Sequence, residues 1–218
     1  MPKLGRPGLF VTFEGVEGSG KSTQVRALEA HLEKRGIPTV VSREPGGTPL
    51  GEELRGILLD PSQRGMLALT ELFLYLASRS EHVSQVVRPA LERGAVVVAD
   101  RYTDASVAYQ GGGRGLGWEV VEPLNRLATG GVKPDITFLL DLEPEDGLAR
   151  FSGANGRPVL DRIESEALEF HRRVRAAYID ASRREPARFV VLDAGRDPGE
   201  ITRLVVQRVD DLLKRRGL

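Results

Sequence analysis

The chain has 218 residues, of which 40% are hydrophobic, and this length and composition predict a single globular domain over residues 1–218. Its 31 lysines and arginines balance 31 aspartates and glutamates, and no apolar run reaches the ~20 residues of a membrane span. We therefore expect neither a nucleic-acid nor a membrane partner. Cysteine is absent, which excludes disulfides and thiolate catalysis and is typical of a cytoplasmic protein.

Strand-like and helix-like patterns alternate along the chain. Apolar runs predict five strands, at residues 9–13, 39–41, 95–99, 136–140 and 189–192. Apolar side chains at helical spacing predict the helices, at residues 21–35, 50–59, 68–91 with an interruption near Pro89, 119–129, 163–184 and 201–213. Glycine and proline content predicts loops at residues 43–49 and 111–117, and a polar, glycine-rich stretch predicts a mobile loop at residues 150–161.

This alternation predicts an α/β fold, a doubly wound five-stranded parallel sheet with helices on both faces. Ligands of such sheets bind at the carboxyl ends of the strands. Glu14, Asp100 and Asp141 each follow a predicted strand end, so we expect them to line one rim.

A phosphate-binding sequence connects the first strand to the first helix. Residues 15–22 match G-x-x-x-x-G-K-[ST], in which glycines let successive backbone N–H groups point into one hollow at a helix N-terminus. Lys21 can reach the β- and γ-phosphates, and the Ser22 hydroxyl can ligate Mg²⁺. The residues expected to bind ATP phosphates are Gly15, Val16, Glu17, Gly18, Ser19, Gly20, Lys21, Ser22 and Thr23.

A second chemical signal lies at the end of the third strand. In a chain with a phosphate-binding loop, Asp100 is in the expected position for an acidic group beside Mg²⁺. Arg101 can donate two hydrogen bonds to a phosphate. The sequence thus predicts a Mg²⁺ site at Ser22 and Asp100, with a phosphate-binding arginine beside it.

Several longer stretches resemble the thymidylate kinase family. They are residues 13–23, Arg43-Glu44-Pro45-Gly46-Gly47-Thr48, Asp100-Arg101-Tyr102 with Ser106 and Ala108-Tyr109-Gln110-Gly111, Leu139-x-Asp141, and Asp161-Arg162-Ile163-Glu164. The similarity covers about residues 9–195. It implies a homodimeric kinase that uses ATP and Mg²⁺ to phosphorylate dTMP to dTDP.

The resemblance also implies roles for single residues. Glu17 would contact the 3′-hydroxyl of dTMP, and Arg101 would hold its phosphate. Tyr75 would stack on the thymine, with Phe73 as the alternative ring, and Arg79 one helical turn later would bond the base edge. The full set expected to bind dTMP is Glu17, Tyr75, Arg79, Arg101, Ser106, Tyr109 and Gln110.

Residues 150–161 resemble the lid of this family. The phosphate-binding loop has no arginine between Val16 and Ser19, whereas the lid has Arg150 and Arg157, as in the subgroup with a basic lid. Either lid arginine could cover the transferring phosphate. The expected catalytic residues are Lys21, Arg101, Arg150 and Arg157.

Phosphoryl transfer to a phosphate needs positioning and charge neutralisation, and no general base, because the acceptor oxygen is already anionic. Two other functions stay open. One is another nucleotide kinase or a deoxynucleoside kinase on the same fold, and a nucleoside acceptor would require a general base near its 5′-hydroxyl. The other is a non-catalytic ATP sensor, which would have no need for residues that face a sugar and a base.

Overall fold

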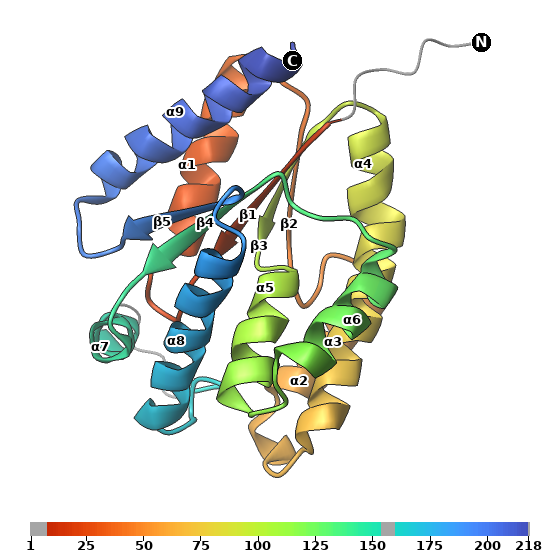
Figure 1. Ribbon diagram of the computed structural model, residues 1–218, viewed down its shortest axis with the longest axis vertical. Helices are drawn as coiled ribbons and strands as arrows, with labels where there is room; N and C mark the ends of the chain where they lie inside the picture. Colours follow the sequence, from red (N-terminus) through yellow and green to blue (C-terminus); the bar gives the residue numbers. More distant parts are fainter. Residues whose placement is uncertain (1–7, 154–159, 218) are drawn as a thin grey trace.

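The computed structural model describes residues 8–153 and 160–217. In this part of the chain, five parallel strands form one sheet in the order β2-β3-β1-β4-β5 (Figure 1). The strands are β1 (Leu9–Glu14), β2 (Thr39–Arg43), β3 (Val96–Asp100), β4 (Ile136–Asp141) and β5 (Phe189–Asp193). Helices cover both faces, which confirms the predicted α/β class.

Strand β1 lies at the centre of the sheet and is buried along its whole length, whereas β2 at one edge is half-buried. Phe13 of β1 pairs with Asp100 of β3, and Glu14 pairs with Leu139 of β4. The carboxyl ends of these three strands therefore lie side by side, and the phosphate-binding loop leaves the sheet at its middle.

The helices divide into those on the sheet faces and those beyond its end. Helices α1 (Lys21–Lys34) and α9 (Pro198–Arg216) pack together on one face, and the π-helical η2 (Val83–Val87) with α4 (Arg88–Glu92) packs on the other. Beyond the carboxyl ends of the strands lie α2 (Pro49–Leu59), α3 (Ala68–His82), α5 (Thr103–Ser106), η3 (Val107–Gly113), α6 (Trp118–Thr129) and α8 (Leu168–Arg184) (Figure 1). Short segments at η1 (Pro61–Gln63) and α7 (Pro144–Gly153) complete the described elements.

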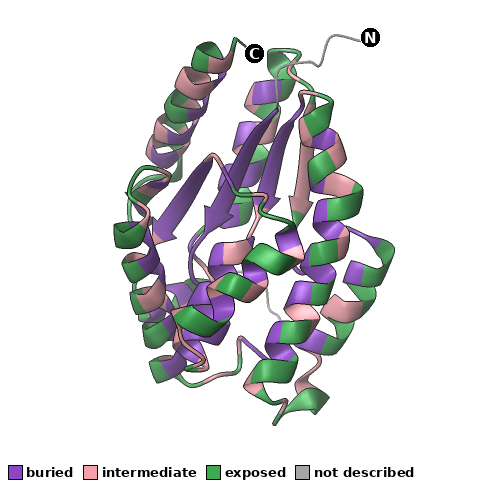
Figure 2. Ribbon diagram, turned by 45° about the vertical axis from the view of Figure 1, so that its right-hand side comes forward, coloured by how far each residue is buried: buried purple, intermediate pink, exposed green. Residues whose placement is uncertain are grey.

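Alternate side chains of β1 enter two different apolar clusters. Leu9, Val11 and Phe13 belong to the larger cluster, which includes the buried side of α1, while Phe10 packs with Val83 and Val87. The inner strands are accordingly buried, the edge strand β2 is half-buried, and the outward sides of the helices are exposed (Figure 2). A strand covered on both faces explains why its sequence is apolar at nearly every position.

The glycine-rich stretch at residues 111–113 was predicted to be a loop, and this is wrong. These residues are the end of the π-helical η3. A Cβ at Gly112 would overlap the Cβ of Ala177, and one at Gly113 would contact the Phe170 ring. The glycines therefore permit close packing of η3 against α8, and the chain turns only afterwards, at residues 114–117.

Two further boundaries differ from the sequence-based expectation. Residues 150–153 form the last turn of α7, while residues 154–159 of the expected lid lie outside the described residues. The next helix begins at Leu168 and not at residue 163, because Asp161 Oδ1 accepts hydrogen bonds from the N–H groups of Ile163 and Glu164 and so fixes a turn. Helix α3 continues through η2 into α4, and Pro89 follows the π-helical stretch at the second position of α4.

Candidate active site

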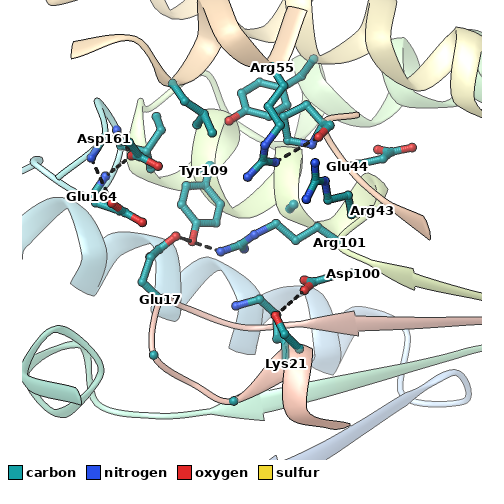
Figure 3. Close-up of a pocket in the computed structure, with 18 of the residues that line it drawn as sticks. Glu17, Lys21, Arg43, Glu44, Arg55, Asp100, Arg101, Tyr109, Asp161 and Glu164 are labelled. Atoms are coloured by element: carbon teal, nitrogen blue, oxygen red, sulfur yellow. Dashed lines mark hydrogen bonds and ion pairs between the residues drawn. The ribbon is translucent and has the colours of Figure 1, made fainter. Parts of the chain in front are cut away.

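A cavity of about 440 Å³ lies at the carboxyl ends of β1 and β3, between the phosphate-binding loop and helices α2, α3 and η3 (Figure 3). The predicted site residues that line it are Glu17, Gly18, Gly20, Lys21, Ser22, Thr23, Tyr75, Arg79, Asp100, Arg101, Tyr109, Gln110 and Arg150. The structure thus brings most of the residues predicted for ATP and for dTMP to one cavity, while Gly15, Val16, Ser19 and Ser106 are not among its lining residues. Asp141 is paired with Arg175 at 2.7 Å instead and is not among the lining residues.

The phosphate-binding loop has the curled backbone that its sequence predicts. Gly18 and Gly20 have φ angles of 72° and 91°, and α1 begins directly after them at Lys21. The Lys21 ammonium donates to the carbonyls of Gly15 and Val16, both at 2.9 Å, and so folds back over its own loop. Burial, with the nearby Arg101 cation, lowers the pKa of Lys21 to about 8. Anionic phosphates bound in the loop would favour the charged form of Lys21 and so return its pKa toward the usual value.

The two residues predicted to hold Mg²⁺ lie within hydrogen-bond distance of each other. The Ser22 hydroxyl donates to Asp100 Oδ2 at 3.1 Å, and both side chains line the cavity. The described residues contain no group of three or more histidine, cysteine, aspartate or glutamate side chains placed to hold a metal ion. One hydroxyl and one carboxylate fit Mg²⁺, which takes few protein ligands and completes its shell with phosphates and water.

Arg101 lies close to Lys21, since both side chains donate to the carbonyl of Gly15, and its guanidinium is held by three acceptors. Its Nη2 donates to Glu17 Oε1 at 2.8 Å, its Nη1 donates to Gly15 O and to the Tyr178 hydroxyl, both at 3.0 Å, and its Cζ lies 4.8 Å from the centre of the Tyr109 ring. Tyr109 also donates to Glu17 Oε1, at 2.5 Å (Figure 3). Burial opposes the charge of Glu17, but Arg101 and neighbouring donors hold the pKa of its carboxyl well below the usual range. The result is an anion and a cation fixed side by side.

Arg79 is buried and nearly saturated with hydrogen bonds. Its Nε donates to Glu44 Oε2 at 2.7 Å, its Nη1 donates to Ser106 Oγ at 2.9 Å and Asn125 Oδ1 at 2.6 Å, and its Nη2 donates to Tyr102 O at 2.9 Å. Among the described residues, these contacts use four of its five N–H groups and leave one. Ser106 lies behind Arg79 and does not line the cavity, so its own contact with a base stays a prediction.

The two candidate aromatic rings on α3 have different surroundings. Tyr75 lines the cavity, and burial raises the pKa of its hydroxyl to about 12. Phe73 is 51% exposed and is not among the lining residues. Tyr75 is therefore the ring that a ligand in the cavity would meet. Gln110 lines the same side and donates to Glu71 at 2.8 Å.

Sequence reasoning missed part of the cationic lining. Arg43 and Arg55 face the cavity, where Arg55 donates to Pro45 O at 3.0 Å and has its pKa lowered by burial and by Arg43 (Figure 3). The apolar periodicity of α2 predicted the helix but gave no sign of what its polar side would face. Arg150 lines the cavity and donates to Ala194 O at 2.9 Å, while Arg157 lies outside the described residues.

Known proteins resemble this chain over most of its length. Residues 13–205 match the family profile described as "Thymidylate kinase". The chain is 47% identical over 208 residues to a thymidylate kinase of Symbiobacterium thermophilum, with 95% of each chain covered. It is 49% identical to one from Desulfosudis oleivorans, covering 94% of this chain and 99% of the relative. A crystal structure of thymidylate kinase from Ehrlichia chaffeensis matches with a TM-score of 0.75 and 33% identity, over 94% of this chain and 99% of the other. The chain belongs to the thymidylate kinase family.

Proposed function

We infer that this protein is an ATP-dependent nucleoside monophosphate kinase that converts dTMP to dTDP. The observation that carries this function is the single cavity that joins the phosphate-binding loop to Glu17, Tyr75, Arg79 and Arg101. A site for ATP alone would need only the phosphate-binding loop. The other four residues offer groups for a sugar, a base and another phosphate, and the family of the chain supports dTMP as that acceptor.

The mechanism follows from where the charged groups lie. The ATP phosphates would occupy the hollow of residues 15–23, where Lys21 would exchange its bonds to the loop carbonyls for bonds to the β- and γ-phosphates. Arg101 would hold the acceptor phosphate next to them, with Arg43 and Arg55 adding positive charge. Because the acceptor oxygen is anionic, the protein needs to align the two phosphates and screen their repulsion, and it needs no base.

The remaining contacts select a deoxythymidine nucleotide. Glu17 Oε2 lies 3.5 Å from His171 Nδ1 and accepts no hydrogen bond from the described residues, so it can serve as the acceptor for the 3′-hydroxyl of the sugar. The free N–H of Arg79 suits a carbonyl of the base, and Tyr75 can stack on its ring. Tyr109 is bonded to Glu17 and would pack against the sugar beside it. A polar pocket of this kind rejects bases whose donors and acceptors do not match.

Ser22 and Asp100 are the residues that would hold Mg²⁺, which when bound neutralises phosphate charge. Arg150 and Arg157 would be the lid arginines, either of which could cover the transferring phosphate. We also propose that the chain forms a single domain over residues 1–218, with a lid near residues 150–161, and that it is located in the cytoplasm. Among the helices that the structure describes, none has the length and apolar character to cross a membrane.

We further propose a homodimer, as the family resemblance implies. Helices α3 and α6 lie against each other, and each carries two exposed apolar side chains. These are Leu69, Phe73, Val120 and Leu127, which are 44%, 51%, 43% and 79% exposed. Exposed apolar residues gathered over two packed helices are typical of a protein–protein interface.

The function is tested by a coupled ADP-release assay with dTMP, dUMP, dCMP, AMP, GMP and thymidine as acceptors. We expect kcat/KM to be highest with dTMP, and lower by roughly 10²-fold or more with dCMP and the purine nucleotides. A Lys21→Ala variant that keeps its melting temperature serves as the inactive control, and the exposed Arg203→Ala on α9 as the active one. Preference for thymidine would establish the nucleoside kinase alternative, and ATP binding without turnover of any acceptor would establish the sensor.

A further inference from the structure

The hydroxyl of Tyr178 links two parts of the chain that are distant in sequence. Tyr178 lies on α8 and is 1% exposed. Its hydroxyl donates to Glu14 Oε2 at 2.7 Å and accepts from Arg101 Nη1 at 3.0 Å. A hydroxyl has one proton and two lone pairs, so it can bond both partners whether the Glu14 carboxyl is ionised or protonated. Neither Tyr178 nor Glu14 lines the cavity, although the sequence predicted that Glu14 would line the rim beside Asp100.

Glu14 acts on the same arginine through a second contact. Its carboxyl is fully buried, and its Oε1 accepts a hydrogen bond from the backbone N–H of Tyr102 at 2.7 Å. This peptide directly follows Arg101, whose φ angle of 71° makes it the one non-glycine residue in the described ranges with a left-handed backbone. Such a conformation persists only where the surroundings determine it. Glu14 thus fixes the backbone of Arg101, and Tyr178 fixes its guanidinium.

The resulting orientation leaves one side of the guanidinium to a ligand. Both hydrogens of Nη1 go to Gly15 O and Tyr178, and Nη2 donates to Glu17. The hydrogen bonds that the Arg101 guanidinium makes to other described residues come from Nη1 and Nη2 and leave the Nε–H for a ligand, and the side chain lines the cavity. An arginine held in this way can present its Nε–H and second Nη2–H as a fork to a phosphate.

We propose that Tyr178, supported by Glu14, is a positioning residue that holds Arg101 in the orientation that receives the phosphate of the acceptor nucleotide. This inference rests on the proposed function. A purely structural role for Tyr178 is the alternative, because its ring packs in the core and lies 6.2 Å from the ring of Tyr109. The hydroxyl, and not the ring, separates the two explanations.

Tyr178→Phe removes the hydroxyl and keeps the ring. We expect dTMP binding, measured by isothermal titration calorimetry, to weaken by about five- to tenfold, the effect of losing one hydrogen bond that orients a charged group. The affinity for ATP should change less than twofold, because the phosphate-binding loop keeps its contacts. The matched control is Ser182→Ala, which removes another buried hydroxyl from α8, one bonded to Ile179 O at 2.8 Å and not to Arg101. Its affinities for both nucleotides should match those of the unmodified protein.

A double-mutant cycle then tests whether Tyr178 acts through Arg101. In an Arg101→Ala background, Tyr178→Phe should cause no further loss of dTMP affinity. Equal losses in both backgrounds, or a Tyr178→Phe variant that binds dTMP within twofold of the unmodified protein, would overturn the positioning role. Those results would leave the proposed function intact, since the unmodified chain would still bind and phosphorylate dTMP. Failure of the unmodified chain to bind dTMP would instead overturn both.

Discussion

At the scale of single residues, Glu14 is a carboxyl group without access to solvent at the end of the central strand. Burial and the nearby Asp104 carboxylate, against the opposing effect of Arg101, raise the pKa of its carboxyl from an ordinary 4.5 to about 8. The folded protein therefore retains a proton here that the unfolded chain releases above about pH 4.5. The stability that this proton provides is fully present below pH 4.5 and is lost as the pH rises through 8.

Glu14→Gln should remove this dependence, since an amide cannot ionise yet still offers an oxygen to Tyr102 N and an N–H to the Tyr178 hydroxyl. Urea denaturation at pH 6, 7 and 8 should show that the unmodified protein loses free energy of unfolding relative to the variant. The expected slope is at most about 1.4 kcal/mol per pH unit. Above pH 8 the carboxyl is ionised in both states, so the difference should level off. Parallel curves for the two proteins would contradict the assignment.

Residue-scale prediction from sequence depended on spacing along one element. The four-residue interval between Tyr75 and Arg79 predicted that both lie on one side of a helix, and both do line the cavity. Glu44, which holds Arg79, is 35 residues away in sequence and on a different element. Such a contact exists only once β2 and α3 have packed, so no local pattern could have shown it.

At the scale of elements, α7 approaches the phosphate-binding loop through two glycines. A Cβ at Gly147 would overlap the carbonyl oxygen of Glu17, and one at Gly18 would overlap the carbonyl of Gly147. Backbone therefore meets backbone, with no side chain between them. The position of α7 and the shape of the loop that would bind ATP depend on each other.

Gly147→Ala should consequently destabilise the protein by about 1–3 kcal/mol, as overpacking does, although alanine is the better helix former. We also expect weaker ATP binding in calorimetry, because relief of the overlap must move either α7 or Glu17. The control is Gly56→Ala on α2, where an added Cβ would meet nothing within 4 Å. That change should stabilise by about 0.4–1 kcal/mol. Equal free energies of unfolding for the two variants, measured in urea, would show that the contact has no energetic weight.

Element-scale errors came from glycines whose role is packing and not turning. The run at residues 111–113 is typical of a loop, but there the missing side chains let η3 lie against Ala177 and Phe170 of α8. Helix α7 was missed for a related reason, since Gly147 and Gly153 interrupt its short apolar pattern. A glycine that permits a helix contact and one that permits a turn look the same in a sequence.

At the scale of the whole molecule, the class of fold was predictable because the five strands are short apolar runs separated by longer amphipathic segments. That alternation requires parallel strands with crossover helices. The order β2-β3-β1-β4-β5 was not predictable in this way, since periodicity shows which residues are buried and not which strand is the neighbour. This strand order brings two distant motifs to one cavity. They are residues 15–23 and residues 100–110.

We predict that two copies of the chain associate through the outer sides of α3 and α6. Leu127 is 79% exposed, so Leu127→Glu combined with Phe73→Glu should cost a monomer little, yet it would place charges in the proposed interface. Sedimentation velocity at micromolar concentration should show a dimer for the unmodified protein and a monomer for the double variant. Val191→Glu alters an exposed valine on the edge strand β5, away from these helices, and should remain dimeric. A double variant that still sediments as a dimer would move the interface elsewhere, because two buried, unpaired carboxylates at each copy's contact surface are incompatible with tight association.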